Sequence, residues 1–377
     1  MRSKPGPGAA RIAYCGPIAQ PGLPARGGYE SANRRLIDDL RTRGLDVLEF
    51  AYPVASGSTA AKAVTYAGRF AAIVRDLLRE RRRWDLLHIT PLYGRFLYAE
   101  ALLCGLAWSL GKRVVFDIRA GCFVSFYQER GRAYCALVDA LLGRTDLLAL
   151  EGKEDLVFAQ ARCSAPIMHL PNYVSRAPAR PSAKRYDTPL RLVFLGRVVP
   201  EKGIEVAIGA LECLLAKGLD ARLDVIGGGE ERYVATLRAR TESLPVAWTG
   251  SLPQEEMRAR MTDAHFFVFP TRHFGEGHSN ALTEAMAEGL VPVCSEQGFN
   301  RSVVEDAGVI LPVTASASDY AEAIASIWLS GRCPDLSAAA HERVKHHFTG
   351  DVVLSDLIRH YEAAKHSDRL TPHLHRS

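Results

Sequence analysis

The 377-residue sequence lacks the features of several protein classes. It has no uninterrupted apolar run of about 18 residues, which excludes a bilayer-spanning helix. Its start, MRSKPGPGAARIAYCGPIAQ, has no continuous apolar run before the first strand-like segment, so we expect no cleaved signal peptide. The eight cysteines lie far apart and mostly among apolar residues, which predicts reduced cytosolic thiols and neither disulfides nor a metal site.

Acidic metal-binding pairs are also missing, because Asp-x-Asp occurs nowhere in the chain. Such a pair commonly holds Mg²⁺ on a nucleotide, so we expect any nucleotide to be bound without a metal.

Charge is uneven along the sequence: residues 1–185 hold 28 Lys and Arg against 16 Asp and Glu, and residues 186–377 hold 19 Lys and Arg against 26 Asp and Glu. The first half should therefore favour an anionic partner.

The length suits two α/β domains of roughly 150 residues or more each. Strand-like runs alternate with amphipathic helical patterns in the first half, as in RIAYCG, YESANRRLIDDLRTRG, LDVLEFA, WDLLHIT and KRVVFDIRA. This alternation predicts a parallel sheet between helices. The stretch 175–189 has three prolines and no periodicity and is typical of a linker, and a second alternating series follows it. We expect two doubly wound, Rossmann-like domains, 1–180 and 186–350, with ligands between them.

In the second domain, FGEGHSNALTEAMAEGLVPV sets two carboxylates eight positions apart. We expect a helix from about Ser279 or Asn280 to Gly289, with Glu276 just before it and Glu284 inside it. The N-terminus of a helix offers free N–H groups and a positive dipole end, which suit a phosphate. The carboxylates would then accept hydrogen bonds from hydroxyl groups. In isolation, the same pair is more often a helix cap and a solvated helix face.

Two further loops follow predicted strands. FLGRVVPEKG places Arg197 and Lys202 after one strand, and VIGGGEE places the glycines 227–229 after the next. Arg gives a bidentate fork and Lys a point charge, a combination suited to a diphosphate. Alone, each motif is commonly a surface turn, and no acidic residue follows at the spacing of a Rossmann NAD site.

Taken in order, GRVVPEKG, VIGGGEE, TDAHFFVFPTRHFGEG and EGHSNALTEAMAEGLVPV resemble the retaining glycosyltransferases of family 4, which have the GT-B fold. The resemblance is specific from about Leu190 to Val313 and weaker over the N-terminal half. It implies that Arg197 and Lys202 bind the donor diphosphate, that Glu276 contacts the donor sugar and that Glu284 contacts the ribose.

The resemblance also implies a set of donor-binding backbone positions, which are Gly28, Gly196, Gly228, Gly277, His278, Ser279, Asn280 and Ala281. Gly28 belongs to ARGGYESANRR, which resembles the family's N-terminal glycine loop but is equally consistent with a simple turn. Many members have Phe-Gly where this chain has His278-Ser279. This departure preserves the backbone role and leaves the donor sugar open.

On the acceptor side, the candidates are Asp117 and Arg119, at the end of the strand in FDIRAGCF. Family members often have a histidine near the position of Arg119, so a histidine-assisted acceptor step is in doubt. His88 also ends a strand, and we interpret it as structural because such histidines are commonly half-buried and hydrogen-bonded.

Two predicted helices could make contacts outside their own stretch of sequence, one with a membrane and one with the first domain. Residues 69–84, RFAAIVRDLLRERRRW, combine an apolar face with arginines that suit an anionic membrane surface, although a helix covering the sheet is the simpler interpretation. In proteins with the GT-B fold, a final helix such as the one expected at about 352–377 often returns to the first domain.

The sequence thus predicts a nucleotide-sugar-dependent glycosyltransferase, cytoplasmic or peripheral at the inner membrane face, in polysaccharide or glycolipid synthesis. Its partners would be a nucleotide sugar as co-substrate and a sugar or lipid-linked acceptor, with no nucleic acid, cofactor or metal. The alternatives are a sugar-nucleotide epimerase or hydrolase, a non-catalytic nucleotide-sugar-binding subunit and, least favoured, an NAD oxidoreductase.

Overall fold

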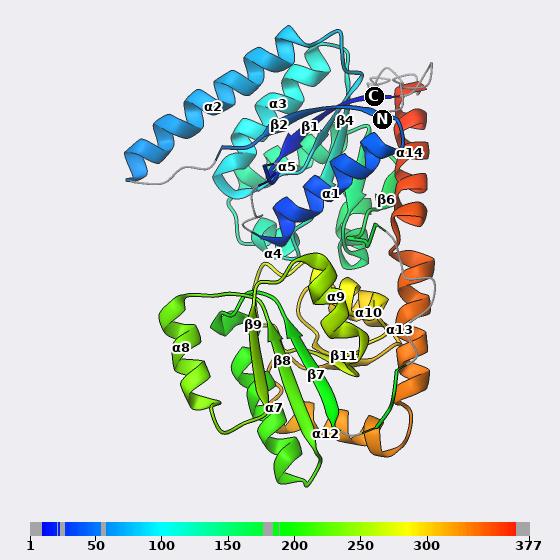
Figure 1. Ribbon diagram of the computed structural model, residues 1–377. Helices are drawn as coiled ribbons and strands as arrows, with labels where there is room; N and C mark the ends of the chain where they lie inside the picture. Colours follow the sequence, from blue (N-terminus) through cyan, green and yellow to red (C-terminus); the bar gives the residue numbers. More distant parts are fainter. Residues whose placement is uncertain are drawn as a thin grey trace.

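The computed structural model describes residues 10–20, 22, 27–53, 58–175, 184–187 and 189–366. Two parallel sheets of six strands each are formed there, with helices packed against them (Figure 1). The α/β class with two Rossmann-like domains is thereby confirmed. Most of the stretch expected as a linker (176–183 and 188) and the last residues, 367–377, lie outside the described part.

The first sheet has the strand order β2-β1-β3-β4-β5-β6, and all its pairs are parallel. Its strands are β1 (Arg11–Gly16), β2 (Asp46–Ala51), β3 (Leu86–Ile89), β4 (Arg113–Ile118), β5 (Leu147–Leu150) and β6 (Ile167–His169). Its helical segments are α1 (Gly28–Thr42), α2 (Thr59–Arg79), η1 (Gly94–Phe96), α3 (Leu97–Ser109), α4 (Phe123–Gln128), α5 (Arg132–Arg144), η2 (Lys153–Asp155) and α6 (Leu156–Gln160). Every residue of β3 and β5 is buried, as expected of parallel strands covered on both faces.

The second sheet has the order β12-β11-β10-β7-β8-β9 and is also parallel throughout. Its strands are β7 (Leu190–Leu195), β8 (Ala221–Ile226), β9 (Val246–Gly250), β10 (Phe266–Phe269), β11 (Val291–Ser295) and β12 (Val309–Leu311). Its helical segments are η3 (Pro200–Lys202), α7 (Ile204–Ala216), α8 (Glu231–Arg240), α9 (Gln254–Thr262), α10 (Asn280–Ala287), α11 (Asn300–Val304), α12 (Ala317–Leu329) and α13 (Cys333–His347). Between η3 and α7, Gly203 has a φ of 76°, and a Cβ there would lie 2.1 Å from the carbonyl oxygen of Pro270, so only glycine fits.

The last helix, α14 (Gly350–His366), leaves the second domain and packs on the first. Figure 1 shows α13 in orange beside the lower domain and α14 in red beside the upper one. Val353, Leu357 and Tyr361 are buried in one cluster with Ile12 and Tyr14 of β1. The chain therefore crosses between the domains twice, and the first domain is completed by residues from the end of the sequence.

The helix expected at 69–84 begins ten residues earlier, as α2, and ends at Arg79. Ile73 and Leu77 are buried in the core of the first domain, so the second half of α2 covers that domain. Within the described ranges, no helix has both the length and the apolar character needed to cross a membrane. The eight cysteines are all free thiols.

Candidate active site

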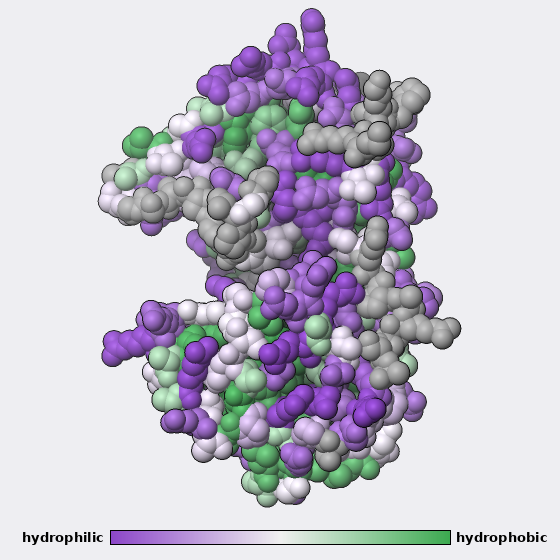
Figure 2. All heavy atoms as spheres, in the orientation of Figure 1, coloured by the Kyte–Doolittle hydropathy of each residue, from purple (hydrophilic) through white to green (hydrophobic). Residues whose placement is uncertain are grey.

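A cavity of about 670 Å³ lies between the two domains. Figure 2 shows a hollow in the surface between the upper and lower halves of the molecule. The cavity wall comes from loops that follow the carboxyl ends of strands in both sheets, where ligands bind in open α/β sheets. Of the residues singled out in the sequence, the following line it: Gly28, Arg119, Gly196, Arg197, Lys202, Glu276, Gly277, His278, Ser279, Asn280, Ala281 and Glu284.

Two expected site residues do not line the cavity: Asp117 is fully buried, and Gly228 is exposed in the turn after β8. The carbonyl oxygen of Gly228 accepts a hydrogen bond of 2.8 Å from the N–H of Val198. A Cβ on the next residue, Gly229, would lie 2.1 Å from the carbonyl oxygen of Val198. The glycine turn after β8 thus supports the loop that carries Arg197, because only residues without a side chain allow the two loops to pack so closely.

Glu276 is held by groups from its own domain. Its Oε2 atom lies 2.6 Å from Nζ of Lys202 and accepts a 2.8 Å hydrogen bond from the hydroxyl of Thr271. The Lys202 and Glu276 side chains are only 14% and 7% exposed. The backbone is packed as closely, since a Cβ on Gly121 would lie 1.8 Å from the Glu276 carbonyl oxygen. The first domain therefore contacts the second at the backbone of the residue whose carboxylate is expected to meet the donor sugar.

The helix after Glu276 is α10, which begins at Asn280, is preceded by the cap residue Ser279 and ends two residues before Gly289. The expected bounds are confirmed to within two residues. Its first amides have no partners within the helix, and they face the cavity because residues 279–281 line it. This end of the helix is available to an anion.

His278 does not project its ring into the cavity. Its Nε2 atom lies 2.6 Å from the hydroxyl of Thr283, and the ring packs edge-on against Phe348 at 4.9 Å. Burial lowers the pKa of His278 to about 3, so the ring is neutral. The imidazole is thus held by Thr283 and Phe348, two residues of the second domain.

The backbone of His278 is held by the first domain. Its N–H donates a 2.9 Å hydrogen bond to Oε2 of Glu151, and its carbonyl oxygen accepts one of 2.5 Å from the side-chain amide of Asn172. Glu151 is buried, and burial raises its pKa to about 8, with Arg119 opposing the shift. The neighbouring Gly277 is required, because a Cβ there would lie 2.1 Å from the Glu151 carboxylate.

Glu284 also meets the first domain. Its Oε1 atom lies 3.0 Å from Nη2 of Arg35, on α1. Burial raises the pKa of Glu284, and Arg35 opposes the shift. Next to this pair, the side chain of Asn280 donates a 3.1 Å hydrogen bond to the carbonyl oxygen of Gly28. The start of α1 thus lies directly over the start of α10.

Arg119 begins a buried chain of polar groups that leads away from the cavity. Its Nε donates a 2.6 Å hydrogen bond to Asp117, whose carboxylate lies 3.0 Å from Nε2 of His88. Nδ1 of His88 lies 2.6 Å from the hydroxyl of Tyr361 in α14. Burial alone would raise the pKa of Asp117, but Arg119 and His88 hold it below its usual value. His88 is fully buried and outside the cavity wall, which agrees with its interpretation as structural.

Four residues that bond to predicted site residues were missed from the sequence. Glu151, Asn172 and Thr271 all follow strands, at the ends of β5, β6 and β10, so their position was a usable signal. Arg35 lies inside α1, where an arginine looks like any solvated helix residue. No local pattern could have paired it with a carboxylate 249 positions away.

Two Rossmann-like domains that face a shared cavity define the GT-B fold, and solved structures support this assignment. The chain aligns over 94% of its length with all of the Anabaena protein HepE, solved in complex with UDP, at a TM-score of 0.66 and 13% identity. It aligns over 94% with all of a sucrose-phosphate synthase from Thermosynechococcus elongatus, at a TM-score of 0.69 and 18% identity.

Residues 175–347 match the family model described as glycosyl transferases group 1. This match covers the second domain, and the expected resemblance to a family of glycosyltransferases is confirmed there. A GDP-mannose-dependent phosphatidylinositol monomannoside mannosyltransferase of Mycobacterium tuberculosis is 28% identical over 52% of this chain and 54% of its own length. The putative colanic acid biosynthesis glycosyltransferase WcaL of Escherichia coli is 29% identical over 49% and 47%. The matched region spans about half the length of these curated relatives.

Proposed function

We propose that the protein transfers a sugar from a nucleotide diphosphate sugar to a hydroxyl group, with retention of the anomeric configuration. The observation that carries the proposal is the convergence of two cations, two carboxylates and a helix N-terminus on one cavity. The residues are Arg197, Lys202, Glu276, Glu284 and the first turn of α10. Retention follows from the resemblance to family 4 and not from this geometry.

The cations would stabilise the leaving group. Cleavage of the bond between sugar and phosphate builds negative charge on the diphosphate, and preorganised positive groups lower that barrier. Lys202 has three N–H donors and uses one on Glu276, so two remain for phosphate oxygens. The guanidinium of Arg197 lines the cavity and is exposed, and no group of the described chain pairs with it. Together with α10, these groups supply the charge that a metal would otherwise provide, so we propose that none is needed.

The carboxylates would hold hydroxyl groups. Glu276 accepts bonds from Lys202 and Thr271 on one oxygen, Oε2, which leaves Oε1 for a sugar hydroxyl. Glu284 uses Oε1 on Arg35, which leaves Oε2 for the ribose. Each carboxylate thus keeps one oxygen available in the cavity.

The acceptor would enter from the first domain. Nη2 of Arg119 is buried and has no hydrogen-bond partner among the described groups, although Arg119 lines the cavity. An acceptor oxygen would satisfy it, with Asp117 fixing the guanidinium from behind. The names of the mannosyltransferase and of WcaL support an acceptor in glycolipid or polysaccharide synthesis. The basic first half of the chain supports a location at the inner face of a membrane.

Thermal unfolding in the presence of UDP-glucose, GDP-mannose and NAD tests the donor class. A ligand at 100 times its Kd stabilises the protein by about 2.7 kcal/mol, so the true donor nucleotide raises the Tm and NAD does not. Product analysis with that donor then separates transfer from epimerisation, and turnover in EDTA tests metal independence. The proposal is wrong if no sugar nucleotide shifts the Tm, or if the donor sugar changes without an acceptor.

A further inference from the structure

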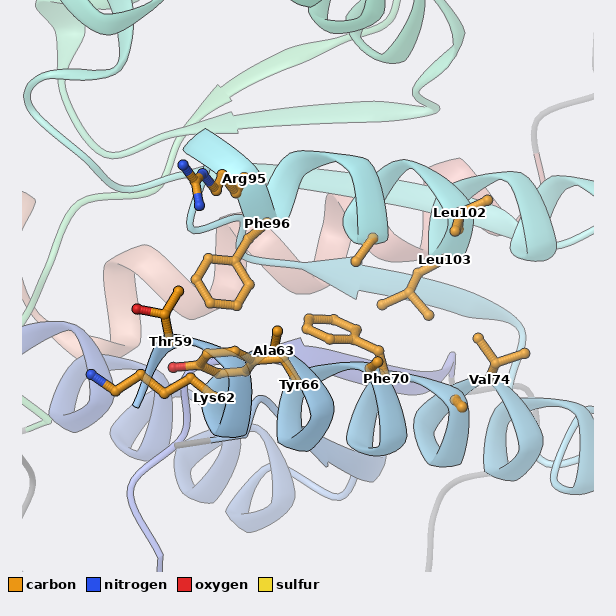
Figure 3. Close-up of a pocket in the computed structure, with 13 residues that line it drawn as sticks. Thr59, Lys62, Ala63, Tyr66, Phe70, Val74, Arg95, Phe96, Leu102 and Leu103 are labelled. Carbon is orange, nitrogen blue, oxygen red and sulfur yellow. The ribbon is translucent and has the colours of Figure 1, made fainter. Parts of the chain in front are cut away.

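A second cavity, of about 660 Å³, lies between α2 and α3 of the first domain. Figure 3 shows side chains of both helices facing each other across it, with the rings of Tyr66, Phe70 and Phe96 at one end and Val74 and Leu103 toward the other. The Tyr66 and Phe96 rings pack edge to face at 5.1 Å. We call this cavity the α2–α3 groove; its wall is apolar along most of its length.

The rim of the groove is apolar as well. Leu102 lines it and is 72% exposed, and Tyr98, one turn earlier on α3, is 57% exposed. Figure 2 shows apolar atoms among hydrophilic ones over this part of the upper domain. An apolar groove with exposed apolar side chains at its rim is a candidate binding site.

Charge is confined to one end of the groove. Lys62 of α2 and Arg95 of η1 lie at the end marked by Phe96 (Figure 3). Neither forms an ion pair with any described carboxylate. Two unpaired cations at one end of an apolar channel fit an amphiphile with an anionic head and a hydrocarbon tail.

The charged end adjoins the interdomain cavity. Leu92 and Tyr93 line that cavity, and Arg95 and Phe96 line the groove. Because Phe96 comes only three positions after Tyr93, the two walls lie within roughly 10 Å of each other along the chain. A head group held by Lys62 and Arg95 would therefore lie near the edge of the interdomain cavity.

We propose that the α2–α3 groove binds the hydrocarbon chain of a phosphate-linked lipid acceptor, with Lys62 and Arg95 on the phosphate. The acceptor sugar then reaches the interdomain cavity. The inference rests on the proposed transferase function, since it names the class of acceptor for that site. The excess of Lys and Arg in the first half of the chain favours the same anionic ligand.

Calorimetric titration of the full chain with dodecyl phosphate, below its micelle concentration, tests the groove directly. Each methylene removed should weaken binding by roughly fourfold, so octyl phosphate, with four methylenes fewer, should bind roughly 250-fold more weakly. Ala67 lines the groove and is exposed, so Ala67→Trp fills the channel without disturbing the core and should weaken dodecyl phosphate binding at least tenfold. Val64, 74% exposed on the same helix and outside the groove wall, gives the matched control: Val64→Trp leaves binding unchanged.

The phosphate site has its own variants. Lys62→Ala and Arg95→Ala should each weaken dodecyl phosphate binding roughly fivefold, the effect of one basic residue near a lipid phosphate. Arg69→Ala removes an exposed arginine of α2 that does not line the groove and serves as the control. Equal losses in all three variants would mean that only general surface charge attracts the probe, and would overturn the proposal.

The outcomes also separate the groove from the transferase function. If sugar nucleotides raise the Tm and a soluble acceptor is glycosylated, but dodecyl phosphate does not bind, the groove proposal is wrong and the proposed function stands. If dodecyl phosphate binds with the expected pattern and no sugar nucleotide does, the groove stands and the proposed function fails. A change of oligomeric state in Ala67→Trp, with unchanged probe binding, would assign the groove to a second copy of the chain and overturn the proposal.

Discussion

Replacing Lys202 by methionine removes one ammonium from the cavity and nearly preserves the side-chain length. In the native protein, Nζ lies 2.6 Å from Oε2 of Glu276, and both side chains are almost enclosed, at 14% and 7% exposure. The hydroxyl of Thr271 still donates to the same carboxylate oxygen in the variant. The substitution therefore removes a catalytic charge and the principal partner of a buried carboxylate together.

The substitution should lower both kcat and the free energy of unfolding. Loss of one preorganised donor to a developing charge costs about 10²- to 10³-fold in kcat. Removal of one partner of a buried ion pair costs about 3–5 kcal/mol of unfolding free energy. We expect the lower end, about 3 kcal/mol, because Thr271 remains bonded to Glu276 and the pair keeps some exposure.

A second substitution separates the two effects. Lys202→Met combined with Glu276→Gln removes the unpaired carboxylate, and glutamine can still accept a hydrogen bond from Thr271. Most of the lost stability should return in urea unfolding, and donor turnover should stay at the level of the single variant or below. Lys217→Met is the control, because Lys217 pairs with Glu322 at the surface, with exposures of 44% and 68%, and such exposed pairs contribute little to stability.

Turnover is measured as nucleotide released from the sugar nucleotide that gives the largest rise in Tm. A folded Lys202→Met protein that releases nucleotide as fast as the wild type refutes the catalytic role of the lysine. If the double variant is no more stable than the single one, an unpaired Glu276 was not the cause of the instability.

The other predictions concern the loop contacts around α10. Glu284→Ala should weaken nucleotide diphosphate binding about tenfold, as the loss of a hydrogen-bonded carboxylate implies, and calorimetry measures the change. Gly277→Ala should lower both Tm and turnover because its Cβ would lie 2.1 Å from the carboxylate of Glu151, whereas Gly105→Ala in α3, where a Cβ meets nothing within 4 Å, should stabilise by about 0.5–1 kcal/mol. Burial raises the pKa of Glu151 to about 8, above the ordinary value near 4.5. Between these two pH values the folded state binds more protons than the unfolded state, so the stability of the wild type falls as pH rises from 4.5 to 8. Glu151→Gln should remove the part of this fall in unfolding free energy that is due to Glu151, about 1.4 kcal/mol per unit of pKa shift. Equal slopes of unfolding free energy against pH in the variant and the wild type would contradict the prediction.

Much of the fold could be predicted because it is encoded locally. The runs RIAYCG and KRVVFDIRA contain β1 and β4, and LRLVFLG and ARLDVIGGG contain β7 and β8. Buried parallel strands form short apolar segments between turn residues, and that signal needs no knowledge of partners. The start of α2 was missed because its first ten residues, TAAKAVTYAG, border an open groove and carry little apolar periodicity.

The candidate site was predictable only where one loop holds several functional groups. The interval between Glu276 and Glu284, and the loop with Arg197 and Lys202, are each contiguous in sequence. The groups that the first domain adds come from more than 100 positions away: Glu151 lies 127 positions from His278, and Asn172 lies 106 away. Contacts over such separations depend on how the two domains pack, and no periodicity encodes them.

These interdomain contacts have a consequence for donor binding. Arg35 holds the carboxylate expected to meet the ribose, and Glu151 accepts a hydrogen bond from an amide in the loop expected to cover the phosphates. The first domain therefore bonds to groups that, under the proposed function, the donor also uses. A donor can bind only by sharing these groups or by replacing their partners, and the second route loosens the contact between the domains. A ligand shifts a conformational equilibrium by its differential affinity for the two states. We therefore expect donor binding and domain opening to be coupled at the N-terminus of α10.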